Sequence, residues 1–209
     1  IKDFVKLQKI GKENYDLKEL MREPFFLNED VKVLEMNSKS GLYPLYIAYS
    51  IYRMLLPKDE AHMTLEEAQS IWQKALDNHL FVLCQTTMAV SITNRTLVGY
   101  TKAPVNTVYL TKLIERMQDK KRLANKLTNP ETWGKEGEHL KFDAVVGNPP
   151  YQEMDGGNGA SASPVYQHFI DTARQLSPSY ISMITPSRWF TGGKGLDDFR
   201  DSMLTDQRI

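Results

Sequence analysis

The 209-residue chain is 41% hydrophobic, which is enough to bury the core of one large domain, or of one domain with a small appendage. Lys and Arg together number 26, as do Asp and Glu, so no global positive field indicates a nucleic-acid partner and any basic surface must be local. The lone cysteine, Cys84, excludes an intramolecular disulfide and a cysteine-based zinc site.

The chain has no apolar run near the roughly 18 residues of a membrane helix, and its N-terminus has no signal-peptide core. We therefore expect a cytoplasmic protein without a membrane partner. The sequence starts at Ile1 rather than Met and ends in "TDQRI", which indicates a piece of a longer protein. Residues 1–28 are charged with scattered aromatics and predict a helical N-terminal extension, whereas residues 29–209 are expected to form an incomplete catalytic domain.

From Val31 onward, short apolar segments alternate with helical patterns. Strands are expected at residues 31–36, 79–84, 105–110, 142–146 and 180–185. Helices are expected at residues 42–56, 65–78, 88–98, 111–127, 164–176 and 195–204. The first of these helices has too many apolar residues for a surface helix, so we expect it to be buried. Ser163, followed by Pro164 as the first helical residue, is expected to begin the fifth helix.

Helix boundaries are marked by capping residues. Thr64 and Glu67 form a capping-box pattern. Thr86 or Thr87 can cap the following helix, which Gly99 closes in the C-cap position.

Alternating strands and helices predict an α/β fold with a doubly wound, parallel sheet. In such sheets, ligands bind beyond the carboxyl ends of the strands. The stretches "EMNSKSG", "CQTT", "NPPY" and "TPSRW" each come directly after a predicted strand. These four stretches are therefore expected to share one edge of the sheet.

The most informative stretch is "FDAVVGNPPYQE", in which Asn148, Pro149, Pro150 and Tyr151 follow an apolar strand. Two consecutive prolines remove two backbone donors and fix φ near −65° at both positions. An exocyclic amine on a base is a poor nucleophile until acceptors pull it toward tetrahedral geometry. The Asn148 side-chain amide and the rigidly held Pro149 carbonyl are suited to this, and Tyr151 offers a face for base stacking. Alternatively, the prolines only end a buried strand.

This stretch resembles the catalytic motif of S-adenosylmethionine-dependent amino-methyltransferases, most closely the Eco57I-like adenine-specific DNA methylases of restriction-modification systems. The resemblance extends through "YISMITPSRWFTGGKGLDDFR", so it covers residues from Phe142 to Arg200. It implies a Rossmann-like class I methyltransferase fold that is truncated at its C-terminal end. It also implies that Asn148 and Pro149 contact the adenine amine and that Tyr151 stacks on the flipped base.

The resemblance also implies a cofactor site after the first strand, in "LEMNSKSG". Glu35 occupies the acidic position, Gly41 the last glycine, and Asn37 lies between them. Lys39 stands where an earlier glycine is usual, and Gln85 stands where the second strand should end in a carboxylate. Gly41 could instead simply start the next helix.

Arg188 and Trp189 lie on the predicted edge and are assigned to substrate binding, although Trp189 could equally be buried in the core. Cys84 is expected in the core. The four histidines show no metal-ligand spacing. "DKKRLANK" is expected to be a solvated helix rather than a phosphate contact. The loop at residues 155–163 is expected to be mobile.

Together these patterns predict the methyltransferase domain of a bacterial restriction-modification enzyme, which uses S-adenosylmethionine to methylate the amino nitrogen of adenine in double-stranded DNA. Its target-recognition part, and possibly a nuclease, would lie in the same full-length chain. Two alternatives stay open. One is a non-catalytic DNA-binding or assembly domain that has lost cofactor binding, and the other is a methyltransferase acting on protein glutamine or on an RNA base.

Overall fold

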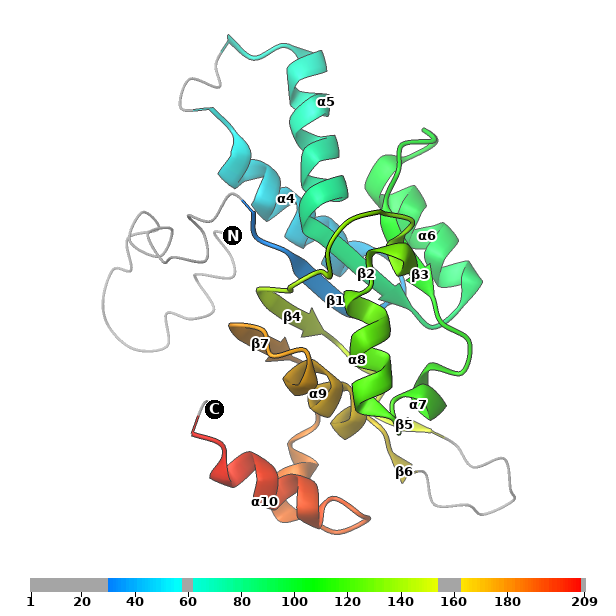
Figure 1. Ribbon diagram of the computed structural model, residues 1–209, viewed down its shortest axis with the longest axis vertical. Coiled ribbons are helices and arrows are strands. Elements are labelled where there is room, and N and C mark those ends of the chain that lie inside the picture. Colours follow the sequence, from blue (N-terminus) through cyan, green and yellow to red (C-terminus); the bar gives the residue numbers. More distant parts are fainter. Residues whose placement is uncertain (1–29, 58–61, 154–162, 208–209) are drawn as a thin grey trace.

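The computed structural model describes residues 30–57, 62–153 and 163–207. In these residues a parallel sheet in the order β3-β2-β1-β4-β7 is flanked by helices on both faces (Figure 1). The strands of this sheet are β1 (Val33–Ser38), β2 (Leu80–Cys84), β3 (Asn106–Tyr109), β4 (Ala144–Gly147) and β7 (Tyr180–Met183). The predicted doubly wound α/β fold of the Rossmann-like methyltransferase type is confirmed.

Helices follow each strand of the sheet along the chain. They are α4 (Leu42–Leu55), α5 (Leu65–Lys74), α6 (Thr87–Val98), α7 (Leu113–Arg116), α8 (Lys120–Thr128), α9 (Tyr166–Gln175) and α10 (Asp197–Thr205). Shorter elements are the π-helical turn η2 (Ala75–His79), the 3-10 turns η3 (Pro130–Trp133) and η4 (Ser187–Thr191), and an antiparallel pair of β5 (Gln152–Glu153) with β6 (Ser163–Pro164).

Alternate side chains of the central strands point to opposite faces of the sheet and contribute to two separate apolar cores, because a strand has a two-residue period. On one face, side chains of β1, β2 and β4 pack against α7, α8 and α9; this core includes Leu34, Phe81, Val145, Leu127 and Phe169. On the other face, side chains of β2 pack against α4 and α6; this core includes Leu80, Val82, Ala48, Ala89 and Leu97. A further apolar cluster joins α9 to η4 and α10.

The chain changes direction across the sheet after β3. β2 and β3 are added to one side of β1, and the chain then returns to place β4 on its other side. The carboxyl ends of β1 and β4 therefore lie next to each other at the point where their connections leave toward opposite faces. In open α/β sheets this is where ligands bind.

The structure corrects three predictions about helices. The helix at 42–56 is not buried all round, because only its Pro44, Ala48 and Ile51 are buried, whereas Tyr43, Tyr46 and Tyr49 are exposed. The helix at 111–127 is two helices, because α7 ends at Arg116 and Asp119 begins α8 as its N-cap, accepting a hydrogen bond from the Arg122 amide at 3.0 Å. Ser163 and Pro164 form β6, and α9 begins only at Tyr166.

The capping predictions are confirmed. Thr64 and Glu67 make both hydrogen bonds of the capping box, Thr86 caps α6, and Gly99 follows its last residue. The predicted N-terminal extension at residues 1–28 lies outside the described residues, as does most of the loop predicted at 155–163.

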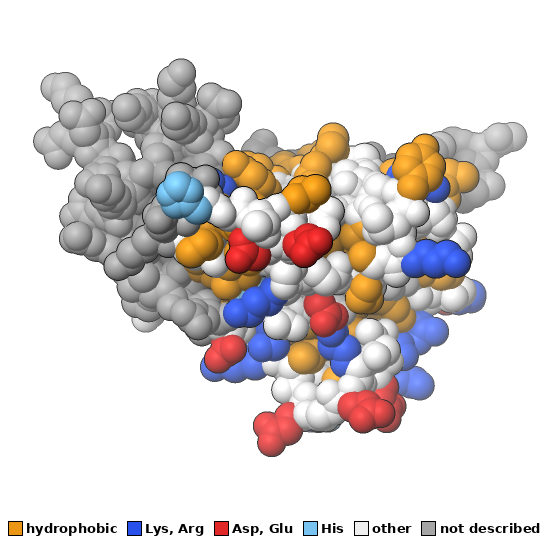
Figure 2. All heavy atoms as spheres, turned by 90° about the horizontal axis from the view of Figure 1, so that it is seen from above, with side chains coloured by type: hydrophobic (Ala, Val, Ile, Leu, Met, Phe, Trp, Pro, Cys, Tyr) orange, Lys and Arg blue, Asp and Glu red, His pale blue; other side chains and the backbone are white. Residues whose placement is uncertain are grey.

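The surface mixes side chains of both signs. Seen from the α5 end, acidic and basic side chains are interspersed with apolar ones (Figure 2). Among the described residues, no helix is both long and apolar enough to cross a membrane.

Gly41 fixes the turn between β1 and α4. Its φ of 79° lies in the left-handed region, where L residues are strained. A Cβ at this position would lie 2.8 Å from Thr96 Cβ and 2.9 Å from Thr93 Cα, so α6 could not approach this turn as closely. Glycine is therefore needed here for both backbone conformation and helix packing.

We predict that Gly41→Ala lowers the free energy of unfolding by about 2–4 kcal/mol, because it combines left-handed strain with overpacking against α6. Gly134→Ala is the matched control, since Gly134 has φ 67° but no atom within 4 Å of the position that its added methyl group would take. The control should lose only about 1–2 kcal/mol. Urea unfolding of both variants checks this, and equal losses would exclude the packing argument.

Candidate active site

The stiff corner at residues 148–151 directly follows β4 and is held at both ends by backbone hydrogen bonds. The Ile184 amide donates to the Gly147 carbonyl at 3.0 Å, and the Val165 amide donates to the Tyr151 carbonyl at 3.2 Å. Asn148 is half-buried, and Tyr151 is 43% exposed. Pro149 is buried and Pro150 is half-buried. The corner therefore packs against the sheet through its prolines, while Tyr151 reaches solvent at the carboxyl edge.

Asn37 connects this corner to β1. Its side-chain Nδ2 donates a hydrogen bond to the Asn148 backbone carbonyl at 2.7 Å. Asn37 is itself buried, and its backbone amide donates to Glu35 Oε1 at 3.1 Å. Residues that are more than a hundred positions apart are thus joined by a single buried side chain.

A bulge in β1 brings these groups to the edge. Glu35 pairs with Val82 and Ser38 pairs with Cys84, so β1 advances three residues while β2 advances two. Bulges redirect side chains and are common beside active sites. The Ser38 hydroxyl is then fixed by the Thr93 hydroxyl of α6 at 2.7 Å.

Glu35 is 1% exposed, and burial raises its pKa to about 8, although the hydrogen bond from the Asn37 amide acts in the opposite direction. The carboxyl group is therefore largely protonated at neutral pH. Its second oxygen, Oε2, has no partner among the described residues.

Two further polar atoms near the carboxyl ends of β1 and β2 are buried without a described partner, namely Asn37 Oδ1 and Gln85 Nε2. Buried polar atoms usually have partners, and an exception calls for an explanation such as a bound group. Together with Glu35 Oε2, they offer sites for a ligand that carries both hydrogen-bond donors and acceptors. Lys39, which stands where the family usually has a glycine, is exposed, so its side chain does not fill the turn between β1 and α4.

The structure places Arg188 and Trp189 in η4, after β7. Arg188 is exposed, whereas Trp189 is 9% exposed and packs edge-on against Phe199 with a ring-centroid distance of 6.1 Å. Phe190, which the sequence pattern did not single out, stacks on Trp189 at 3.9 Å and is 57% exposed. The accessible aromatic ring of η4 is thus Phe190.

Other nucleophilic and metal-binding chemistry finds no support. Cys84 is buried, and this burial raises the pKa of its thiol to about 11, so the thiolate needed of a nucleophile is absent at neutral pH. The described residues contain no group of three His, Cys, Asp or Glu side chains that could hold a metal ion.

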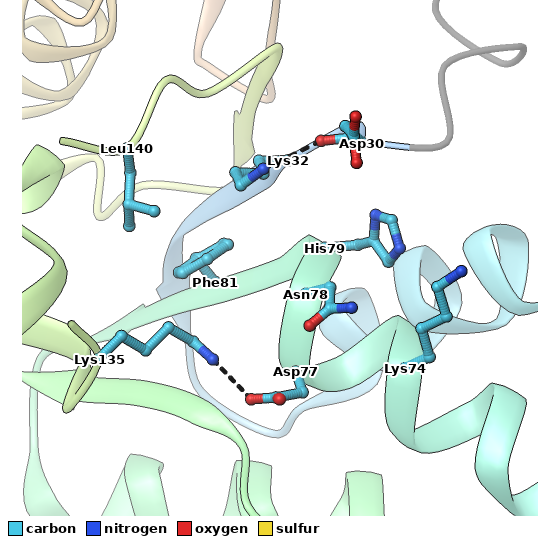
Figure 3. Close-up of a pocket in the computed structure, with 9 residues that line it drawn as sticks. All are labelled: Asp30, Lys32, Lys74, Asp77, Asn78, His79, Phe81, Lys135 and Leu140. Atoms are coloured by element: carbon cyan, nitrogen blue, oxygen red, sulfur yellow. Dashed lines mark hydrogen bonds and ion pairs between the residues drawn. The ribbon is translucent and has the colours of Figure 1, made fainter. Parts of the chain in front are cut away.

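A cavity of about 260 Å³ lies at the opposite, amino edge of the sheet (Figure 3). Lys135 and Asp77 form an ion pair of 2.6 Å across it, and His79 Nδ1 lies 2.7 Å from the Val31 carbonyl oxygen. His79 Nε2 is buried there without a partner among the described residues. The cavity lies away from the corner at residues 148–151, whereas ligands of open α/β sheets bind at the carboxyl edge. We therefore assign no function to it.

Comparison with known proteins decides the family. A family model described as Eco57I restriction-modification methylase matches residues 78–209. The chain belongs to this family. The match runs from the π-helical turn through α10, so the Eco57I-family region includes Gln85 and Asn148 to Tyr151, whereas β1 precedes it. The resemblance seen in the sequence is confirmed.

A protein of Mycoplasma pneumoniae described as an uncharacterized adenine-specific methylase is 41% identical over 75 residues. This match covers 34% of the present chain and 17% of the relative.

We predict that the contribution of Glu35 makes stability fall as pH rises from 5 to 8, whereas His79 and His168, whose pKa values are lowered by burial, act in the opposite direction at the acidic end of this window. The folded state holds a proton on Glu35 up to about pH 8, whereas the unfolded chain releases it near 4.5, so unfolding is favoured by rising pH across this window. At about 1.4 kcal/mol per pKa unit, the loss is roughly 2–4 kcal/mol. Urea unfolding at several pH values should show this slope, and Glu35→Gln should flatten it.

Glu67→Gln is the matched control for this slope. Hydrogen bonds from Thr64 lower the pKa of Glu67, so Glu67 is ionised throughout the window and its replacement should leave the slope unchanged. An unaltered slope in Glu35→Gln would contradict the assignment to Glu35.

Proposed function

We propose that this chain is the methyltransferase part of a restriction-modification enzyme and transfers a methyl group from S-adenosylmethionine to the N6 amino nitrogen of a flipped-out adenine in double-stranded DNA. The observation that carries the proposal is the corner at residues 148–151, which exposes Tyr151 and is tied through Asn37 to the carboxyl end of β1. Membership of the Eco57I family supports methyl transfer, and the name of the Mycoplasma relative supports adenine as its target.

The corner can activate an aromatic amine. Asn37 engages the Asn148 backbone carbonyl, while the side-chain amide of Asn148 makes no hydrogen bond within the described part of the chain. Its oxygen and the Pro149 carbonyl can each accept one N–H of the adenine amine. This turns the nitrogen lone pair out of conjugation with the ring, and Pro150 stiffens the geometry in advance. With S-adenosylmethionine bound, the amine would take the methyl group as the S–CH3 bond of the sulfonium breaks, the neutral thioether S-adenosylhomocysteine would leave, and one proton of the amine would pass to solvent.

Tyr151 is suited to hold the extruded base. Its ring is partly exposed beside Asn148, and stacking of a base on an aromatic ring contributes about 1–3 kcal/mol. Arg188 and the exposed ring of Phe190 belong to the following strand-end segment and are further candidates for contacts with the substrate, whereas Trp189 supports them from the core.

The buried polar atoms at β1 and β2 fit the donor molecule. S-adenosylmethionine supplies an electrophilic methyl group on a sulfonium, together with ammonium and hydroxyl donors and ring acceptors. Asn37, and Glu35 once it has released its proton, would accept from such donors, and Gln85 would make a neutral hydrogen bond in place of a carboxylate. Gly41 holds the turn beside them. In this proposal the enzyme works in the cytoplasm, with a target-recognition region and possibly a nuclease in the full-length chain.

Asn148→Ala tests the amine activation. It removes one of two preorganised acceptors, so methylation by the full-length enzyme should fall by roughly 100-fold or more. Transfer of labelled methyl groups to adenine in duplex DNA measures this, with circular dichroism as the folding check. Methylation that survives within a few-fold would refute the mechanism.

Tyr151→Phe is the matched control for the same assay. It keeps the stacking face and removes only the hydroxyl, so methylation should stay within a few-fold of the parent.

Calorimetric titration with S-adenosylmethionine separates a catalytic domain from a domain that has lost its cofactor, since only an intact cofactor site gives saturable heat. Parallel assays with protein and RNA substrates test the remaining alternative.

Asn37→Ala tests the connection between β1 and the corner. Without the hydrogen bond to the Asn148 carbonyl, the corner is held less firmly, and kcat should fall about tenfold at an unchanged KM for DNA. Ser38→Ala is the control, because Ser38 is equally buried but bonds to Thr93 instead. Equal effects of the two substitutions on kcat would show a merely structural role for Asn37.

A further inference from the structure

Besides the corner at residues 148–151, a surface at the carboxyl edge of the sheet carries a concentrated positive charge. Residues 111–126 contain six Lys or Arg and two Asp or Glu, whereas positive and negative residues balance over the whole chain. The structure folds this segment into α7 and α8 with a groove of about 520 Å³ between them. The groove is lined by Lys112, Glu115, Arg116, Asp119, Arg122, Leu123 and Lys126.

Both acidic residues of the groove are already engaged. Glu115 pairs with Lys112 at 3.0 Å, and Asp119 accepts a hydrogen bond from the Arg122 backbone amide as the N-cap of α8. Arg116 is anchored by its Nε, which donates to the Thr111 carbonyl at 2.7 Å. These contacts leave two side chains, Arg122 and Lys126, with no ion pair or hydrogen bond in the described ranges of the chain.

Arg122 and Lys126 are four residues apart on α8, so they project from the same side of the helix. Both are exposed. Two exposed cations on one helical face, above a concave floor that contains Leu123, form a surface suited to a polyanion rather than to a small ligand.

The groove lies at the edge of the sheet that carries the corner at residues 148–151. α7 begins at Leu113, four residues after β3 ends at Tyr109, so it sits at the carboxyl edge. At the start of α8, Lys120 pairs with Asp171 of α9 at 2.5 Å. The residue just before α9, Val165, donates its backbone amide to the Tyr151 carbonyl. One ion pair, part of one helix and one hydrogen bond thus connect the start of α8 to the corner.

We propose that the groove between α7 and α8 binds the phosphate backbone of duplex DNA through Arg122 and Lys126, beside the target base. This rests on the proposed function, which supplies DNA as the substrate. It revises the expectation that the "DKKRLANK" segment is merely solvated. The contacts position the duplex and carry no sequence information, since phosphates are the same at every site.

The test is the double substitution Arg122→Glu and Lys126→Glu, measured by fluorescence anisotropy with a labelled DNA duplex over a range of salt concentrations. Each lost phosphate contact removes about 0.9 from the slope of log affinity against log salt. We expect the slope to shrink by nearly 2 and the affinity at low salt to fall at least tenfold. Lys102→Glu with Lys141→Glu is the control of equal charge, because both lysines are exposed at the opposite edge of the sheet.

An unchanged affinity and slope in the groove variant would overturn the proposal, as would equal losses in the control. Tighter binding of the parent chain to an RNA duplex than to DNA would also overturn it. Methyl transfer by the parent chain is measured separately. A parent that binds DNA through the groove but transfers no methyl group would refute the proposed function and leave the groove assignment standing.

Discussion

The parallel pairing of β1 with β4 is the constraint on which the rest of the site depends. Val33, Leu34 and Glu35 pair with Ala144, Val145 and Val146 in continuous register. Because the two connections then leave toward opposite faces, the ends of these strands stay uncovered by helices. The side-chain amide of Asn37 then spans the gap between the ends of β1 and β4 and donates a hydrogen bond to the Asn148 backbone carbonyl at 2.7 Å.

The site contains buried polar groups that lower the stability of the fold, and packing elsewhere must offset this loss. A carboxyl group buried at Glu35, together with unpartnered polar atoms of Asn37 and Gln85, costs folding free energy unless a ligand satisfies them. The apolar cores on both faces of the sheet supply the compensating stability. A bound donor molecule would therefore stabilise the protein as well as enable the reaction.

Each edge of the sheet contains both paired and open polar groups. At the amino edge, Lys135 and Asp77 neutralise each other across the cavity. At the carboxyl edge, the Asn148 side chain, Arg122 and Lys126 make no such contacts among the described residues. These open groups lie beside a stiff backbone corner, as the proposed DNA substrate would require.

The sequence by itself determined the strands, most helices and the corner at residues 148–151, because apolar alternation, capping residues and consecutive prolines act over a few neighbouring positions. Only the tertiary structure decided which face of α4 is exposed, that residues 163–164 form a strand, and that Asn37 meets Asn148. Each of these depends on a partner distant in sequence: the helices beside α4, the short strand β5, and the β1–β4 pairing. Local pattern contains no information about such partners, because burial and long-range hydrogen bonds are properties of the assembled layers.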